Sequence, residues 1–321
     1  MKIQLIHKFE DIISVENLLD AWKEFVRGKR RKPDVQEFSM NLMDNILLLH
    51  SDLADFTYKH GGYQAFNISD PKPRNIHKAS VRDRLLHHAI YRILYPFFDR
   101  TFIADSYSYR INKGTHKAIN RFRSFAYEVS RNNTKTCWIL KMDIRKFFAN
   151  IDHRILMRAL YRGIADKYIL WILNEVIRSF PKGLPLGNLT SQLLVNIYMN
   201  ELDQFIKHKL KAMYYIRYAD DFVILSQNKD WLENQIKPIQ DFLSEKLRLE
   251  LHPNKIVIKT LSSGVDFLGW VNFFDHRVLR TATKRRMLKR IKENPAEATI
   301  NSYLGLMRHG NTGKLKRKII I

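Results

Sequence analysis

Three aspartates are placed where they could hold a divalent cation. Asp220 and Asp221 are adjacent within the apolar stretch MYYIRYADDFVILS, where neighbouring like charges are costly unless a positive group neutralises them. Asp143 ends a second apolar stretch, TCWILKMD, 77 residues before Asp220. Oxygen ligands without Cys or His favour Mg²⁺, with Mn²⁺ as the alternative, over zinc. Two such ions about 3.5 to 4 Å apart would clamp the attacking and leaving oxygens of a phosphoryl transfer.

The surrounding pattern predicts the strands that would bring these carboxylates together. Residues 136–143 are typical of a buried strand, and residues 213–226 of a β-hairpin with Asp220 and Asp221 at its tip. A sheet that pairs these two elements would place all three acids at one edge. Paired acids at a turn are also ordinary hairpin chemistry, because Asp favours turns. The pair alone therefore leaves both interpretations open.

Helical periodicity dominates much of the remaining chain. It predicts helices over residues 15–26, 42–53, 81–98 and 190–210, whereas two prolines make residues 63–76 extended. Strands and helices mixed in this order predict an α+β fold in which helices cover one face of an antiparallel sheet.

The net charge favours a phosphate-rich partner. Lys and Arg number 55 against 32 Asp and Glu, which gives a formal charge of +23. Residues 276–321 hold 13 basic residues and two acidic ones. Apolar residues lie among them at helical spacing, which predicts a small helical subdomain with a basic face. Those apolar positions are Leu279, Met287, Ile291, Ile300, Leu304 and Met307. A solvated basic tail is the alternative.

Other classes of protein are excluded by composition. The single cysteine, Cys137, cannot form an intrachain disulfide, and no Cys and His spacing resembles a zinc site. Charged residues break the apolar start of the chain, and no apolar run reaches the roughly 18 to 20 residues of a membrane helix. We therefore expect a cytoplasmic protein, bacterial or phage-encoded, with no membrane partner.

Six ordered blocks resemble the reverse transcriptase family. They are residues 71–118, MDIRKFFANIDH at 142–153, GLPLGNLTSQ at 183–192, RYADD at 217–221, LHPNK at 251–255 and VDFLGW at 265–270. The resemblance extends over about residues 63–321. It implies a right-hand polymerase fold with N-terminal helices and fingers in 1–135, a palm in 136–270 and a small basic helical thumb in 271–321. Part of the fingers would lie at about 154–182. The implied activity is RNA-directed DNA synthesis from dNTPs on template RNA, with a DNA or RNA primer.

The resemblance also implies roles for single residues. Asp143, Asp220 and Asp221, together with Ile144, would hold Mg²⁺, and Lys255 would protonate the leaving pyrophosphate, for which its pKa must be tuned. The implied nucleotide-binding residues are Lys72, Arg74, Phe148, Leu186 and Gly187. The implied template- or primer-binding residues are Gln192, Tyr218, Leu268, Gly269 and Trp270. Arg74 offers a planar fork to phosphate oxygens, and the ring of Phe148 would exclude a 2′-hydroxyl. Ordinary surface or core roles remain open for Lys72, Arg74, Lys255, Leu186 and Trp270.

The block at 183–192 departs from the retroviral and intron pattern. There the middle reads Gln-Gly and the end Ser-Pro, whereas this chain has Leu186-Gly187 and Ser191-Gln192. This pattern resembles the reverse transcriptases of diversity-generating retroelements. It implies error-prone copying of a template-repeat RNA into cDNA and an oligomeric accessory protein. Leu186 removes a hydrogen-bonding amide from a site that senses the nascent base pair, and a site with fewer specific contacts discriminates less.

Two other interpretations remain open. One is a group II-like or phage-defence reverse transcriptase with a different template. The other is a catalytically silent RNA-binding scaffold, against which the three intact aspartates argue. Because 51 residues follow Trp270, we expect no ribonuclease H, maturase or endonuclease domain.

Overall fold

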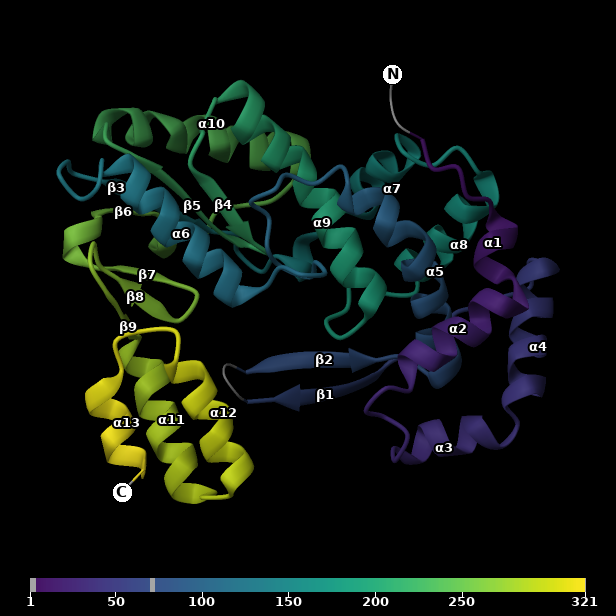
Figure 1. Ribbon diagram of the computed structural model, residues 1–321. Helices are drawn as coiled ribbons and strands as arrows, with labels where there is room; N and C mark the ends of the chain where they lie inside the picture. The colour runs from purple at the N-terminus through teal and green to yellow at the C-terminus, as the bar shows by residue number, and fades with distance from the viewer. Residues whose placement is uncertain (1–3, 70–72, 321) are drawn as a thin grey trace. The chain divides into compact units, whose positions relative to one another are not determined.

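The computed structural model describes residues 4–69 and 73–320, and the chain divides into two compact units (Figure 1). The first unit comprises Met1–Ile103, Arg145–Gln204 and Phe242–Glu250. The second comprises Ala104–Ile144, Phe205–Asp241 and Leu251–Ile321. Each unit combines segments that are distant in the sequence. The predicted division at residues 135 and 270 does not follow these units and stays a prediction.

The first unit is mostly helical. Its helices are α1 (Phe9–Ile13), α2 (Val15–Phe25), α3 (Pro33–Met40), α4 (Leu42–Ala54), α5 (Val81–Asp99), α7 (His153–Tyr161), α8 (Lys167–Arg178) and α9 (Leu189–Gln204). Helix α5 packs against both α2 and α9, and it buries Leu86, Ile90 and Leu94 completely. Ser80 caps its start by accepting a hydrogen bond from the N–H of Asp83. The predicted helices over 15–26, 42–53 and 81–98 are confirmed.

A two-stranded hairpin belongs to the same unit. Strand β1 (Gln64–Ile68) pairs antiparallel with β2 (Arg74–Lys78). The pairing runs from Gln64 opposite Lys78 to Ile68 opposite Arg74. The hairpin confirms the extended conformation predicted for residues 63–76.

The second unit contains the main sheet. Its strands are β3 (Trp138–Asp143), β4 (Tyr215–Tyr218), β5 (Asp221–Ser226) and β6 (Val257–Thr260), in the order β4-β5-β3-β6. Each neighbouring pair is antiparallel. The predicted strand at 136–143, the predicted hairpin at 213–226 and their pairing in one antiparallel sheet are confirmed.

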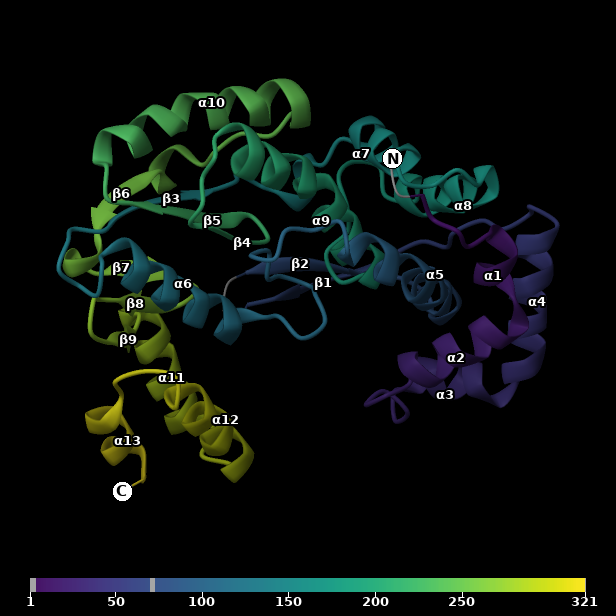
Figure 2. The same ribbon diagram turned by 45° about the horizontal axis from the view of Figure 1, so that its top comes forward.

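Helices cover both faces of this sheet. Consecutive residues of β5, Phe222 to Leu225, are all buried, although consecutive side chains of a strand point to opposite faces. Helix α6 (Thr115–Val129) contributes Phe122 and Phe125 to the core on one face, and Figure 2 shows α10 (Lys229–Leu247) on the other side. The expectation that helices cover one face only is wrong, because apolar residues do not alternate with polar ones along β5.

The C-terminal part of the second unit combines a small sheet with helices. Strands β7 (Val265–Phe267), β8 (Trp270–Asn272) and β9 (Arg277–Leu279) precede α11 (Thr281–Glu293), α12 (Glu297–Met307) and α13 (Gly313–Ile320). Met287 and Met307 are completely buried and pack with Trp270. Lys284, Arg285, Lys289 and Arg290 lie exposed on α11. The predicted helical subdomain with a basic face is confirmed, except that Leu279 belongs to a strand.

One predicted helix changes from α-helical to π-helical geometry before it ends. The helix expected over 190–210 is α9, which ends at Gln204, followed by a π-helical turn at Phe205–Lys209. Apolar spacing did not indicate this change, because both kinds of helix keep Ile206 buried. Over residues 4–69 and 73–320, no helix combines the length and the apolar character needed to cross a bilayer.

Candidate active site

Antiparallel pairing of β3 with β5 brings the predicted metal ligands together. Asp143, the last residue of β3, lies directly opposite Asp221, the first residue of β5. Asp220 lies in the turn just before, and its carbonyl oxygen accepts a 3.1 Å hydrogen bond from the N–H of Ile144. The structure therefore places all four residues at one edge of the sheet. Backbone pairing fixes this arrangement.

Buried polar side chains hold the turn that carries Asp220. Ala219 has a φ of +55°, a left-handed conformation that costs a residue with a Cβ about 1 kcal/mol or more. Ser108 Oγ accepts a 2.8 Å hydrogen bond from the N–H of Ala219. Arg217, which is completely buried, donates to the carbonyl oxygen of Ala219 at 3.2 Å and to Ser106 Oγ at 3.1 Å. Arg217 was not predicted as a site residue, although a cation inside an apolar strand was an available signal.

Two lysines contact the carboxylates. Lys255 Nζ lies 2.7 Å from Asp143 Oδ1, and Lys141 Nζ lies 3.4 Å from Asp221 Oδ2. Burial is the main reason that the pKa of Asp221 is raised to about 6. Lys141 opposes this shift, whereas the negative charges of Asp143 and Asp220 add to it. Lys141 was not predicted as a site residue, although alternation places it on the same face of β3 as Asp143.

The donor set fits a divalent cation. Asp221 Oδ1 is buried and has no hydrogen-bond partner, and such an atom is stabilised when a cation binds it. The carboxylates are hard oxygen ligands of the kind that Mg²⁺ takes. Among residues 4–69 and 73–320, no three Asp, Glu, His or Cys side chains form a ready-made metal cluster. Lysine ammonium groups contact Asp143 and Asp221 instead, so a cation would have to displace or join them.

In the first unit, the segment Gly183–Gln192 is joined to the candidate sugar gate. The N–H of Leu184 donates to the carbonyl oxygen of Phe148 at 2.8 Å. Gly183 has a φ of +69°, and a Cβ there would lie 2.3 Å from that same oxygen. Only glycine fits this close approach. The position of Phe148 is therefore linked to that of the segment.

The middle of the segment lies against β2. The N–H of His77 donates to the carbonyl oxygen of Leu186 at 3.0 Å. Gly187 has a φ of +119°, and a Cβ there would lie 2.9 Å from Ile76 Cγ2. Leu186 and Gly187 thus depend on the hairpin for their position.

The other predicted nucleotide- and template-binding residues of this unit differ in their surroundings. Arg74 is exposed at the start of β2, opposite Ile68. Lys72 lies outside the described residues. Gln192 lines a cavity of about 380 Å³, whose wall also includes the basic residues Lys29, Lys78 and Arg84. This basic lining is compatible with a phosphate-bearing ligand.

The predicted primer-binding residues lie in the second unit. Tyr218 accepts a 3.1 Å hydrogen bond on its hydroxyl from Thr115 Oγ1. Leu268 and Gly269 have positive φ values of 52° and 88° and form the turn between β7 and β8. The Trp270 side chain is 1% exposed and packs against α11 and α12. Its ring supports the fold, and a role of Trp270 in primer binding stays a prediction.

Known proteins with similar sequences were found along most of the chain. The family model "Reverse transcriptase (RNA-dependent DNA polymerase)" matches residues 66–271. Protein YkfC of Escherichia coli K12 is 25% identical over 73% of this chain and 70% of its own length. The group II intron-encoded protein LtrA of Lactococcus lactis subsp. cremoris is 24% identical over 73% of this chain. The match covers 49% of LtrA, about half of its length.

Solved structures with a similar fold include telomerase. Apo telomerase from Candida tropicalis has a TM-score of 0.56 and 12% sequence identity, over 71% of this chain and 50% of that one. At this identity the similarity concerns the fold alone, and it supports the predicted mixed α+β right-hand polymerase fold. Because the family model spans well over half of the sequence, the chain belongs to the reverse transcriptase family.

Proposed function

We propose that this chain is an RNA-directed DNA polymerase that copies a template-repeat RNA into error-prone cDNA for a diversity-generating retroelement. The observation that carries the polymerase activity is Asp143 paired with Asp221 beside Asp220. The retroelement assignment depends on the residues Leu186-Gly187 and Ser191-Gln192 within the block 183–192.

The acids at the sheet edge would hold Mg²⁺ or Mn²⁺. Asp143, Asp220 and Asp221 supply carboxylate oxygens, and Ile144 would add its backbone carbonyl. Bound there, such ions stabilise the charge that develops on the attacking and leaving oxygens. Lys255 carries the proton that the leaving pyrophosphate needs, and its ammonium is oriented by Asp143 at 2.7 Å.

Residues of the first unit would select the nucleotide. The exposed guanidinium of Arg74 binds the triphosphate, because its planar fork matches phosphate oxygens. The ring of Phe148 excludes a ribose 2′-hydroxyl. Leu186 presents an apolar side chain, where an amide would form hydrogen bonds to the nascent pair, so mismatched pairs are rejected less strongly.

The macromolecular partners follow from the same assignment. The substrates are a template RNA, a DNA or RNA primer and dNTPs. The exposed basic residues of α11 would bind the nucleic acid backbone without reading its sequence. An oligomeric accessory protein of the retroelement is the expected protein partner.

Primer extension on an RNA template, with Mg²⁺ or Mn²⁺, tests the polymerase activity. We expect the wild-type chain to incorporate dNTPs and Asp220→Asn to incorporate none at equal concentration and equal thermal stability. Sequencing of the product tests the retroelement assignment, since errors should concentrate opposite template adenine. No incorporation by well-folded wild-type protein, with its RNA and accessory partner present, would favour the RNA-binding scaffold.

A group II-like or phage-defence reverse transcriptase is the second candidate. The 24% identity to a protein that is encoded by a group II intron favours it. The two candidates differ in fidelity and in gene context. A product without errors concentrated opposite adenine, together with no paired template and variable repeats beside the gene, would support the second candidate.

A further inference from the structure

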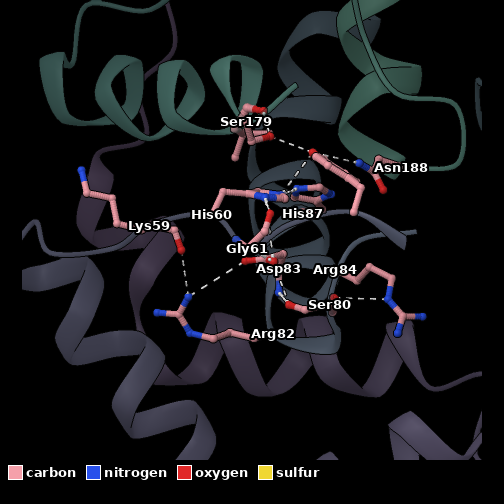
Figure 3. A network of polar contacts seen from close by, with 12 residues as sticks. Lys59, His60, Gly61, Ser80, Arg82, Asp83, Arg84, His87, Ser179 and Asn188 are labelled. Atoms are coloured by element: carbon pink, nitrogen blue, oxygen red, sulfur yellow. Dashed lines mark hydrogen bonds and ion pairs between the residues drawn. The ribbon is translucent and has the colours of Figure 1, made fainter. Parts of the chain in front are cut away.

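A partly buried polar network adjoins the segment Gly183–Gln192, and the proposed reaction does not use it. At its centre is the hydroxyl of Tyr63. This oxygen lies 2.7 Å from Ser179 Oγ, 3.3 Å from His60 Nε2 and 3.5 Å from Asn188 Nδ2. Figure 3 shows Ser179 and Asn188 above the two histidines, at the same end of the network. The network therefore connects the end of α8 with a residue of the segment.

The direction of the hydrogen bonds at Tyr63 follows from its neighbours. The hydroxyl of Ser179 donates to the carbonyl oxygen of Val176 at 2.6 Å. Its oxygen is therefore left to accept the proton of Tyr63, whose own oxygen accepts from Asn188 Nδ2. Burial raises the pKa of Tyr63, so this hydroxyl stays protonated.

Two histidines, His60 and His87, extend the network in one direction. His60 Nδ1 lies 2.6 Å from the carbonyl oxygen of Gly61, so it must carry a proton and donate. Its Nε2 lies 3.2 Å from His87 Nε2 (Figure 3). Burial holds the pKa of His87 well below its ordinary value. The rings of His60 and Tyr63 stack with centroids 5.0 Å apart, so the histidine pair also fixes the plane of the Tyr63 ring.

A buried carboxylate anchors the backbone just before Tyr63. Asp83 is 1% exposed and accepts hydrogen bonds from Tyr58 at 2.7 Å, from the N–H of Gly61 at 3.1 Å and from Ser80 at 2.7 Å. A Cβ on Gly61 would lie 2.8 Å from Asp83 Oδ2. The chain is thus fixed two residues before Tyr63 (Figure 3).

The segment is consequently held from two directions. On one side, the N–H of His77 binds the carbonyl oxygen of Leu186. On the other, Tyr63 binds the amide of Asn188, which is 2% exposed and whose Oδ1 is buried without a partner. The Tyr63 contact of 3.5 Å is long for a hydrogen bond. Removal of the single hydroxyl oxygen of Tyr63 is therefore enough to change how Asn188 is held.

We propose that Tyr63 is a positioning residue that sets nucleotide selection, because its hydroxyl holds Asn188 and hence Leu186 and Gly187 where the nascent base pair forms. This inference rests on the proposed polymerase function. The acids of the sheet edge lie in the other unit, so loss of the hydroxyl changes nucleotide binding and discrimination rather than the chemical step.

Tyr63→Phe removes the hydroxyl and keeps the ring. Hydrogen exchange of the amides of residues 183–192 reports the position of the segment without any need for activity. We expect these amides to exchange about threefold to tenfold faster in the variant, the loss that one hydrogen bond gives. We expect KM for the matched dNTP to rise about threefold to tenfold with kcat nearly unchanged, and the misincorporation spectrum to change. Ser179→Ala, which removes the acceptor of the Tyr63 proton, should shift both readouts in the same direction.

Tyr161→Phe is the matched control, since Tyr161 is 61% exposed on α7 in the same unit. It should leave exchange, KM and errors unchanged. Unchanged exchange in both Tyr63→Phe and Ser179→Ala overturns the inference. Faster exchange with unchanged KM and errors, in an active enzyme, also overturns it and leaves a structural role. An inactive wild-type protein contradicts the proposed function instead, and the exchange data still show whether Tyr63 positions the segment.

Discussion

The sheet edge that carries the acids and the segment that would face the nucleotide are held in different ways. Asp143 and Asp221 are opposed by the backbone register of β3 and β5. The segment Gly183–Gln192 depends instead on single contacts: backbone hydrogen bonds that join Leu184 to Phe148 and Leu186 to His77, and the side chain of Tyr63 at Asn188. A strand register cannot shift by a fraction of a residue, whereas a side-chain contact can lengthen gradually. Under the proposed function, the geometry of the chemical step would be fixed by backbone pairing, and the selection of the nucleotide would be adjustable.

The largest effect is expected at the sheet edge. Asp221→Asn should lower DNA synthesis at least about 1000-fold, since a ligand that stabilises the transition-state charge by several kcal/mol is lost. Without divalent metal, the free energy of unfolding should rise by about 1 kcal/mol or more, because a buried charge with an unpartnered oxygen is removed. Primer extension and urea unfolding in a chelating buffer measure the two quantities.

Asp230→Asn is the control for that prediction, because Asp230 is exposed on α10. It should change neither quantity. A loss of stability in Asp221→Asn would show that the ion pair with Lys141 outweighs the cost of burial. The sheet edge would then be stabilised by its charges and not by the backbone register of β3 and β5 alone.

The next largest effect is expected at the hairpin that supports the segment. Arg74→Ala should raise KM for dNTPs about tenfold to hundredfold, the cost of losing hydrogen bonds to a charged phosphate. Arg74→Lys should recover part of this loss, because a lysine supplies charge without the fork. Steady-state titration of dNTP on a fixed primer-template measures it. Arg158→Ala, an exposed position on α7, is the control, and a fall in kcat without a change in KM would contradict the assignment.

The same difference explains what could be predicted from the sequence. The strands that carry Asp143 and Asp221 are short apolar runs, so their identity and pairing followed from pattern alone. The network around Tyr63 could not be predicted, because it joins residues from 58 to 188 whose separate patterns indicate nothing. Arg217 and Lys141 were missed for a related reason, since a cation within an apolar strand is a signal whose partners lie elsewhere in the chain. The second covered face of the sheet was, by contrast, indicated by the unbroken apolar run of β5.

A smaller effect is expected from the side chain that would face the nascent pair. Leu186→Gln should lower misincorporation opposite adenine about threefold to tenfold, because the added amide supplies one or two hydrogen bonds that only a correct pair satisfies. Sequencing of cDNA from wild-type and variant enzymes on the same template measures it. An unchanged error rate, with the Tm and the rate of matched incorporation retained, would show that Leu186 does not contribute to misincorporation.

The smallest effect is expected in how the stability of the fold changes with pH, through His88 and Asp221. His88 is half-buried near Lys29 and Arg84, and this burial is the main cause that lowers its pKa from 6.5 to about 4. As the pH falls below 6.5, the unfolded chain takes up the proton first, so the fold loses stability down to about pH 4. Asp221 has the opposite effect because its pKa is raised. Its contribution to the stability of the fold is lost as the pH rises from 3.8 to about 6. When the pH falls from 7.5 to 5.5, the free energy of unfolding of the wild-type protein should decrease by about 1 kcal/mol more than that of His88→Gln. Urea unfolding at the two pH values measures this difference, and equal losses in both proteins would contradict it.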